Sequence, residues 1–167
     1  YGLFAAFGGW SAGVLAEMFG ARKVMMFGAC WWIGVHLLFL GIAIPSHIYP
    51  LILCLYAMRG IGYPLFIYSF VVLMAQYISQ SRLASATGFF WTCFSRGIGV
   101  FGAYLPSFIM PIVGEYKTFW FALPFSIVGT LMCFFFVPKN KVVKGEGLSR
   151  KEQLKELAEG ATILVTN

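Results

Sequence analysis

Hydrophobic residues fill five long blocks of the chain, and short polar or proline-containing breaks separate these blocks. A transmembrane helix requires about 20 mainly apolar residues, and each block is close to that length or longer. The pattern therefore predicts an all-α membrane protein, a multi-span helical bundle. The expected spans are residues 1–19, 24–44, 50–77, 84–109 and 118–137.

The composition supports this prediction. Hydrophobic residues make up 60% of the chain and charged residues only 11%, whereas about a quarter of the residues of a soluble domain are charged. The four cysteines lie far apart within apolar blocks, so neither a metal site nor a disulfide framework is expected. No acids, histidines or nucleophiles converge in the pattern. We therefore expect no cofactor, no metal and no enzymatic activity.

Basic residues are distributed unevenly over the predicted breaks. Cytoplasmic loops of membrane proteins carry the excess of Lys and Arg, so residues 20–23, 79–84 and 138–167 are expected in the cytoplasm. The arrangement predicts a multi-pass protein of the plasma (inner) membrane, and it accounts for the net charge of +6 without a nucleic-acid partner. Only Lys117 falls on the opposite side, against Arg22, Lys23, Arg82, Lys139, Lys141, Lys144, Arg150, Lys151 and Lys155.

The segment 138–167, the predicted cytoplasmic loop, is polar throughout most of its length. Ser149 and Glu152 have the spacing of a capping box, which would begin a helix that ends at Gly160. Two leucines of this helix lie on one face. Two interpretations remain open: a short amphipathic helix at the membrane surface, and a solvated linker with one helical stretch.

Two arginines lie inside predicted spans. Arg59 is about 14 Å from the outer end of its span and Arg96 about 18 Å from the inner end of its span. Both are therefore near the middle of a hydrocarbon core about 30 Å thick, where a charge is costly. Each should face a watery cavity, a carbonyl cluster, an acid on another helix, or a ligand. His36 is the main polar residue of the span 24–44, and we expect it to be a packing residue rather than a proton carrier.

Aromatic residues recur at helical spacing around Arg59. They form one face of the span 50–77, and Pro64 is expected to loosen this span near Gly60 and Gly62. The face offers hydroxyl groups and flat apolar surfaces, although a structural tether remains an open role for Arg59. The candidate substrate-binding residues are Tyr56, Arg59, Tyr63, Phe66 and Arg96.

Small residues follow a helical period in the span 84–109. Lipid provides no hydrophobic drive for helix association, so small residues allow close approach of backbones instead. The predicted helix-packing seam consists of Ser85, Gly88, Thr92, Ser95, Gly99 and Gly102. The first span has a similar series of Gly2, Ala6, Gly9, Gly13, Ala16 and Gly20. Sliding between two helices is the alternative role of the seam in the span 84–109.

The segment 13–23, GVLAEMFGARK, places one acid and two bases between two apolar spans. It resembles the loop between the second and third helices of the major facilitator superfamily of transporters, whose pattern is G-x-L-A-D-R-x-G-R-R/K-R/K. Glu17, Met18 and Ala21 depart from this pattern. The matching residues are Gly13, Leu15, Ala16, Gly20, Arg22 and Lys23. The resemblance implies a partial N-terminal half of that fold, helices two to six and the central loop, without the first helix and the C-terminal six-helix half.

The same resemblance implies a conformational gate formed by Gly13, Glu17, Gly20, Arg22 and Lys23. Glu17 ends its helix at the negative end of the helix dipole, so a positive group should hold it. The expected partners are Arg22, Lys23 or a helix N-terminus of the second half. Such a latch would stabilise the outward-open state. A charge that only fixes the topology is the alternative.

The runs RGIGYPLFIYSF and ATGFFWTCFSRGIGVFG are similar, more narrowly, to the polyol permease branch of that superfamily. The branch has G-W-F-W where this chain has Gly88-Phe89-Phe90-Trp91. It has two glycines where this chain has Arg96-Gly97, which introduces a charge. The resemblance implies a secondary active transporter that moves a sugar alcohol or sugar by alternating access.

Other functions remain as alternatives. A transporter of a sugar acid or other organic anion could use Arg59 and Arg96, since a guanidinium binds a carboxylate through two parallel hydrogen bonds. A non-transporting scaffold subunit and a membrane-embedded enzyme are more remote. The expected partners are a small-molecule substrate, the lipid bilayer and the missing segments of the same protein. A coupling proton or sodium ion remains open.

Overall fold

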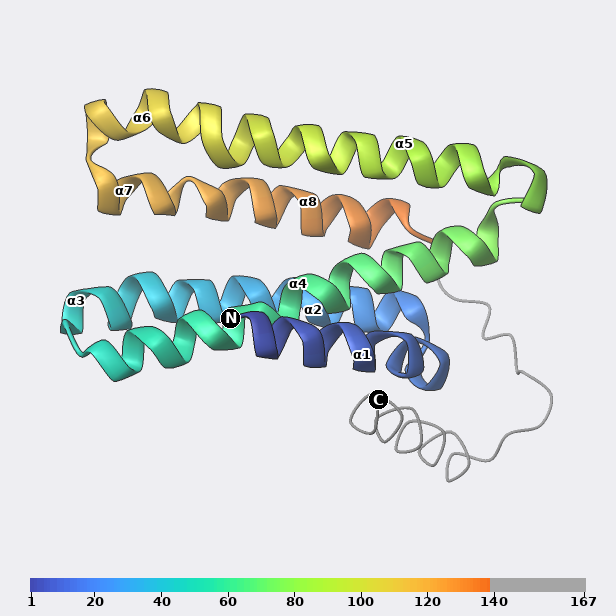
Figure 1. The fold of residues 1–167 in the computed structure, drawn as a ribbon, viewed down its shortest axis with the longest axis horizontal. Helices are drawn as coiled ribbons and strands as arrows, with labels where there is room; N and C mark the ends of the chain where they lie inside the picture. Colours follow the sequence, from blue (N-terminus) through green and yellow to red (C-terminus); the bar gives the residue numbers. More distant parts are fainter. Residues whose placement is uncertain (139–167) are drawn as a thin grey trace, which may run out of the picture.

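The computed structural model describes residues 1–138, which form an elongated bundle of helices roughly aligned with one long axis (Figure 1). The capping box and short helix expected between Ser149 and Gly160 lie outside these residues. The helices are α1 (Gly2–Phe19), α2 (Ala21–Leu38), η1 (Phe39–Ala43), α3 (Ile44–Ser46), α4 (Tyr49–Tyr77), α5 (Gln80–Gly99), η2 (Val100–Tyr104), α6 (Leu105–Val113), α7 (Glu115–Trp120) and α8 (Ala122–Phe136).

Five helical segments in the described residues are long and apolar enough to cross a membrane. This confirms the predicted fold class, a multi-span helical bundle. Two of the segments contain a turn of π-helix, η1 and η2, where the chain passes from one α-helix to the next. The segments are Gly2–Phe19, Ala21–Ser46, Tyr49–Tyr77, Gln80–Val113 and Glu115–Phe136.

Two of the expected polar breaks are reduced to one glycine each. Arg22 and the residue after it belong to the first turn of α2, so Gly20 alone separates α1 from α2. The break expected from Pro111 onward is Gly114 alone, because Pro111 lies within α6. The two glycines have φ angles of 92° and 88°, a region that residues with a side chain rarely adopt. Each sharp turn therefore depends on its glycine.

The connections between helices gather at two opposite ends of the bundle. The α1–α2 turn, the α4–α5 turn and the end of α8 lie at one end, on the right of Figure 1. The α3–α4 and α6–α7 turns lie at the other end. Arg22, Lys23 and Arg82 begin their helices at the first of these ends. Which end faces the cytoplasm stays a prediction.

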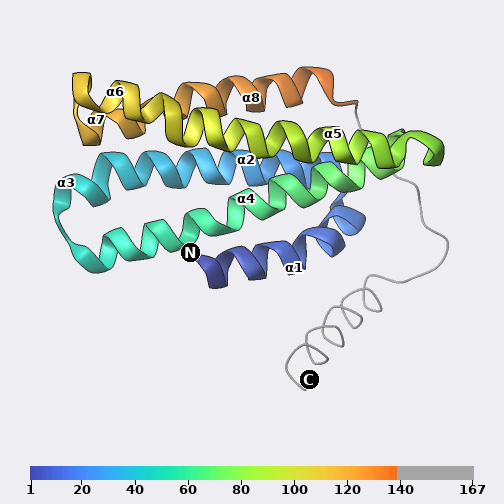
Figure 2. The same ribbon diagram turned by 45° about the horizontal axis from the view of Figure 1, so that its top comes forward.

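The best-packed part of the bundle is the place where α4 passes between α1 and α2 (Figure 2). A Cβ atom added to Gly62 would lie 2.7 Å from the carbonyl oxygen of Gly28. One added to Gly8 would lie 2.9 Å from the carbonyl oxygen of Ile61. Such contacts are too short for a real side chain, so glycine is required at both positions. Close backbone approach therefore holds these three helices together, as expected in lipid.

The packing face of α1 differs from the series chosen from the sequence. Gly8, Ala12 and Ala16 are buried, whereas a Cβ atom at Gly2 or Gly13 would meet no atom within 4 Å. The predicted series was therefore wrong at Gly2 and Gly13, whereas Ala16 and Gly20 are buried and Gly9 packs against Tyr68. Small residues occur on more than one face of this helix, and spacing alone does not distinguish the faces.

The helix α4 continues without interruption through Pro64, which is buried. The loosening expected near Gly60 and Gly62 is not seen. Both glycines instead permit close contacts, and a Cβ atom at Gly60 would lie 2.6 Å from the carbonyl oxygen of Tyr1. These glycines therefore serve packing against neighbouring helices rather than bending of their own helix.

The predicted seam, which lies on α5 and η2, is mostly exposed in the described residues. No residue of α5 is buried, and a Cβ atom at Gly88 or Gly99 would meet no atom within 4 Å. α5 instead meets α4 through aromatic rings, with the centroids of Phe90 and Phe70 5.1 Å apart. A packing role for the seam therefore remains a proposal about parts of the protein beyond residues 1–138.

Candidate functional site

Arg59 lies against aromatic rings that come from a different span. Its guanidinium carbon is 5.0 Å from the ring centroid of Trp32 and 5.5 Å from that of Phe39. Such cation–π contacts contribute about 2 kcal/mol or more where water is excluded. The Nε atom of Arg59 is buried and has no hydrogen-bond partner within residues 1–138. Ring faces are thus its main partners, a kind of partner that the sequence prediction omitted.

Further rings extend this cluster. The ring of His36 stacks on Trp32 with centroids 4.7 Å apart, and its Nε2 lies 3.3 Å from the carbonyl oxygen of Phe119. Nε2 must carry the proton to donate across this contact. His36 is only 1% exposed, which fits the packing role expected for it. Tyr56 joins at the edge of the cluster, 6.3 Å from Phe39 between centroids.

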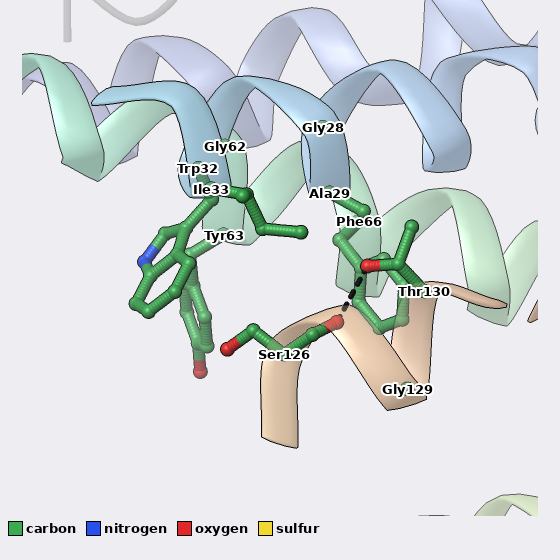
Figure 3. Close-up of a pocket in the computed structure, with 10 residues that line it drawn as sticks. All are labelled: Gly28, Ala29, Trp32, Ile33, Gly62, Tyr63, Phe66, Ser126, Gly129 and Thr130. Carbon is green, nitrogen blue, oxygen red and sulfur yellow. Dashed lines mark hydrogen bonds between the residues drawn. The ribbon is translucent and has the colours of Figure 1, made fainter. Parts of the chain in front are cut away.

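A first cavity of about 280 Å³ lies between α2, α4 and α8 (Figure 3). Tyr63 and Phe66, two predicted substrate residues, reach it from α4, and Trp32 reaches it from α2. The hydroxyl of Thr130 donates to the carbonyl oxygen of Ser126 over 2.7 Å. The hydroxyl of Ser126 likewise donates to a carbonyl oxygen of α8. Both hydroxyl protons are therefore already used within the helix, and the cavity offers a ligand mainly apolar surface.

A second cavity of about 410 Å³ lies between α1 and α4. Tyr63 borders it as well, so this tyrosine lines both cavities. Trp10 of α1 and Tyr68 of α4 also line it, and the sequence analysis singled out neither residue. Tyr68 falls outside the helical series that begins at Tyr56. Trp10 lies among small residues, and these residues predicted helix packing rather than a binding site.

The five predicted substrate residues do not form one site. Tyr63 and Phe66 line cavities, whereas Tyr56 and Arg59 belong to the aromatic cluster. Arg96 is exposed on α5 and lines neither cavity. The two arginines, which were expected at a similar depth, therefore have different surroundings: Arg59 lies against aromatic rings and Arg96 is exposed.

Arg22, in the predicted gate, is directed toward α8. One of its terminal nitrogens donates a hydrogen bond of 2.6 Å to the carbonyl oxygen of Phe134, and its guanidinium carbon lies 5.6 Å from the centroid of the Phe134 ring. This oxygen belongs to the last turn of α8, where carbonyl groups lack partners within the helix. Arg22 therefore caps the C-terminal end of α8, where a positive charge is favoured by the helix dipole.

The other charges of the predicted gate are on the surface. Glu17 and Lys23 are exposed, and Glu17 forms no ion pair with any residue of the described region. The expected pairing of Glu17 with Arg22 is thus not present, because Arg22 is directed toward the end of α8 instead. Gly20 is buried in the turn between them.

The described residues form five apolar spans with cavities between them. This is the fold of an α-helical integral membrane protein. The sequence matches the Major Facilitator Superfamily over residues 1–167, so the chain belongs to that family. No solved structure matches it significantly.

Curated relatives agree with the family and with the resemblance to polyol permeases. The chain is 40% identical to a ribitol transporter of Klebsiella pneumoniae, over 100% of the chain and 39% of the relative. It is also 40% identical to a D-arabinitol transporter of the same organism, over 100% of the chain and 40% of the relative. An alpha-ketoglutarate permease of Bacillus subtilis is 37% identical, over 100% of the chain and 38% of the relative. The chain thus spans about two fifths of the length of these relatives.

Proposed function

We propose that this chain is part of a secondary active transporter that moves a small hydrophilic solute across the plasma membrane by alternating access. The observation that carries the proposal is the pair of cavities beside Tyr63, the middle residue of α4. Substrate sites of secondary transporters lie near the midplane of the bilayer, which is the depth of this residue. Membership of the Major Facilitator Superfamily supports the same activity and argues against an enzyme.

The substrate that we propose is a neutral sugar alcohol or sugar. The relatives named as ribitol and D-arabinitol transporters support this class. No charged residue of the described region lines either cavity, which suits a neutral solute. In this proposal Tyr63, which borders both cavities, contacts the substrate. Arg59 is a positioning residue because its guanidinium is engaged by aromatic rings.

An organic anion is the second candidate. It is favoured by the relative named as an alpha-ketoglutarate permease, at 37% identity. Arg96 is exposed on α5, so its guanidinium could bind a carboxylate in the complete protein through two parallel hydrogen bonds. Arg96 therefore distinguishes the two candidates.

The test is uptake of labelled ribitol by the full-length protein in vesicles, with unlabelled ribitol or alpha-ketoglutarate as competitor. We expect ribitol to compete and the acid to have little effect, in both the parent and Arg96→Gly. Saturable uptake of labelled alpha-ketoglutarate without uptake of ribitol, lost in Arg96→Gly, would replace the polyol with an anion. Absence of saturable uptake of either compound would reject both candidates.

The coupling of transport is a separate part of the proposal. A proton or sodium gradient would drive accumulation of the solute, and the described residues contain no feature that selects between the two ions. Collapsing each gradient in turn identifies the ion, because only the coupled gradient should be needed for uptake against a concentration difference. Uptake that never exceeds equilibrium would reject active transport.

We also retain the predicted gate and topology as proposals. The residues of the predicted gate lie around the α1–α2 turn, and the conformational change of transport would act at this end of the bundle. These residues are Gly13, Glu17, Gly20, Arg22 and Lys23. That end, with the segments 20–23, 79–84 and 138–167, is proposed to be cytoplasmic because it carries the excess of bases.

A further inference from the structure

The cavity between α1 and α4 has a position that suits substrate binding. Tyr63 is the middle residue of the 29-residue helix α4, and Trp10 lies near the middle of the 18-residue helix α1. Both side chains line this cavity, whose volume is about 410 Å³. Small-molecule pockets have volumes of about 300–1,000 Å³. The cavity is therefore large enough for a small solute and lies at the depth of a transporter site.

The polar groups of this cavity are neutral and unused. The side chains of Trp10, Tyr63 and Tyr68 are 37%, 40% and 48% exposed, and their indole N–H and hydroxyl groups form no hydrogen bond within residues 1–138. A tyrosine hydroxyl both donates and accepts, and an indole donates. These three groups can therefore satisfy several hydroxyls of one solute. The ring faces beside them offer flat apolar surface to the C–H groups of a carbon chain.

Gly9 determines how closely Tyr68 approaches α1. A Cβ atom at Gly9 would lie 3.0 Å from Cε2 of Tyr68, so any side chain there would push the ring away. Ala5 and Ala6, which also line the cavity, keep the wall of α1 shallow. The cavity thus depends on small residues on α1 and on large rings that lie across it.

We propose that Trp10, Tyr63 and Tyr68 form the binding site for a neutral polyhydroxylated solute, and that Gly9 determines the space available to it. This inference rests on the proposed transport function and adds two binding residues, Trp10 and Tyr68, and one size-determining residue. The solute is an acyclic polyol of the size of ribitol, because the site provides several neutral hydrogen-bonding groups and no charge to pair with an anion.

The cavity between α2, α4 and α8 is the competing location, and its chemistry is less suitable. The hydroxyl groups of Ser126 and Thr130 already donate within α8. The remaining lining from α2 is apolar except for the indole N–H of Trp32. Substitutions at Ser126 and Thr130 therefore serve as controls, since they alter the other cavity and leave the α1–α4 cavity intact.

The experiment measures equilibrium binding of radiolabelled ribitol to the purified full-length protein, together with the KM of uptake. We expect Trp10→Leu and Tyr68→Phe each to weaken binding about tenfold, with Trp10→Tyr retaining most of the affinity. Gly9→Ala should weaken binding similarly by displacing the ring of Tyr68. Ser126→Ala and Thr130→Val should leave the dissociation constant within about twofold of the parent.

Matched substitutions at exposed aromatic residues far from the cavity control for general damage. Trp120 is the last residue of α7 and Tyr49 is the first residue of α4. The variants Trp120→Leu and Tyr49→Phe should both bind ribitol like the parent. The inference is overturned if the parent binds ribitol and the variants at positions 9, 10 and 68 bind it equally well. A parent that binds and transports no polyol would instead reject the proposed function. Unchanged thermal unfolding of each variant shows that it is folded.

Discussion

The guanidinium of Arg22 donates a hydrogen bond to the carbonyl oxygen of Phe134, 2.6 Å away and 112 residues later in the chain. This contact joins the first turn of α2 to the last turn of α8, and so links the predicted gate to the last helix of the described residues. Arg22 also covers the Phe134 ring. The gate arginine is therefore a helix cap in this structure, and its removal has consequences that can be measured.

We predict that Arg22→Ala lowers the stability of the full-length protein by about 1 to 2 kcal/mol. It would remove a charged hydrogen bond and a favourable interaction with the dipole of α8. The measurement is the apparent melting temperature of the purified protein in detergent. Lys23→Ala is the matched control, since Lys23 is the exposed neighbour. Equal melting temperatures for the two variants would show that the cap contributes nothing.

The glycine contact between α2 and α4 leads to a second prediction. Gly62→Ala should destabilise the protein by about 1 to 3 kcal/mol, because its new methyl group would meet the backbone of α2 and the helices would have to separate. Gly34→Ala, also within a helix, adds a methyl group in open space and should be neutral or stabilising. The folded fraction after heating, followed by size-exclusion chromatography, compares the two. Similar losses for both variants would contradict the proposed close approach.

Long apolar helices could be predicted from the sequence because hydrophobicity is a property of each segment by itself. The five spans contain the five predicted blocks almost completely, although Arg22 and Pro111 lie inside helices rather than in breaks. A charged residue or a proline is tolerated near the end of a helix when other groups satisfy the backbone. The breaks predicted from polar residues and prolines were therefore longer than the observed ones.

The site was harder to predict because it depends on contacts between segments. Trp32 and Phe39 stabilise Arg59 from a span that lies at least 20 residues earlier in the chain, and helical spacing relates residues of one helix only. Tyr63 and Phe66, which helical spacing places on one face of α4, both line the cavity between α2, α4 and α8. It could not show that Tyr68 faces α1, since that depends on the absence of a side chain at Gly9.

A third prediction concerns the coupling between Arg59 and Trp32. Arg59→Lys keeps the charge but loses the planar group that lies over the ring, and Trp32→Leu removes the ring. Each substitution should lower the melting temperature. The double variant should lose less free energy of unfolding than the sum of the two single losses. The double-mutant cycle should give a coupling free energy of about 1 to 2 kcal/mol.

The control for this cycle is a pair on α5. Arg96 is exposed and Trp91 packs against Phe90 and Phe94, so Arg96→Lys and Trp91→Leu should be additive within about 0.5 kcal/mol. If the Arg59–Trp32 pair is also additive, the aromatic contact does not stabilise the arginine, and a ligand or another helix must do so.

The orientation of the bundle can be tested by labelling. We predict that a membrane-impermeant thiol reagent added outside cells labels His47→Cys and Tyr116→Cys, and does not label Arg82→Cys. The background is a variant in which Cys30, Cys54, Cys93 and Cys133 are replaced by serine or alanine. Positions 47 and 116 lie at the end of the bundle opposite position 82. The reverse labelling pattern would place the basic end outside and overturn the topology.

The last prediction concerns the charge of Glu17. Because Glu17 is exposed and forms no ion pair within residues 1–138, any partner of its carboxylate belongs to another part of the protein or to another state of the cycle. We predict that Glu17→Gln slows transport by about tenfold or more with nearly normal expression, whereas Glu17→Asp has a mild effect. Glu115→Gln, an exposed acid at the opposite end of the bundle, should transport like the parent and controls for the loss of one negative charge. Initial rates of ribitol uptake at saturating substrate separate this effect from a change in binding, since a latch alters the rate of the conformational change and not the contacts with the solute. Normal uptake by Glu17→Gln would mean that this charge only fixes the topology of the α1–α2 turn.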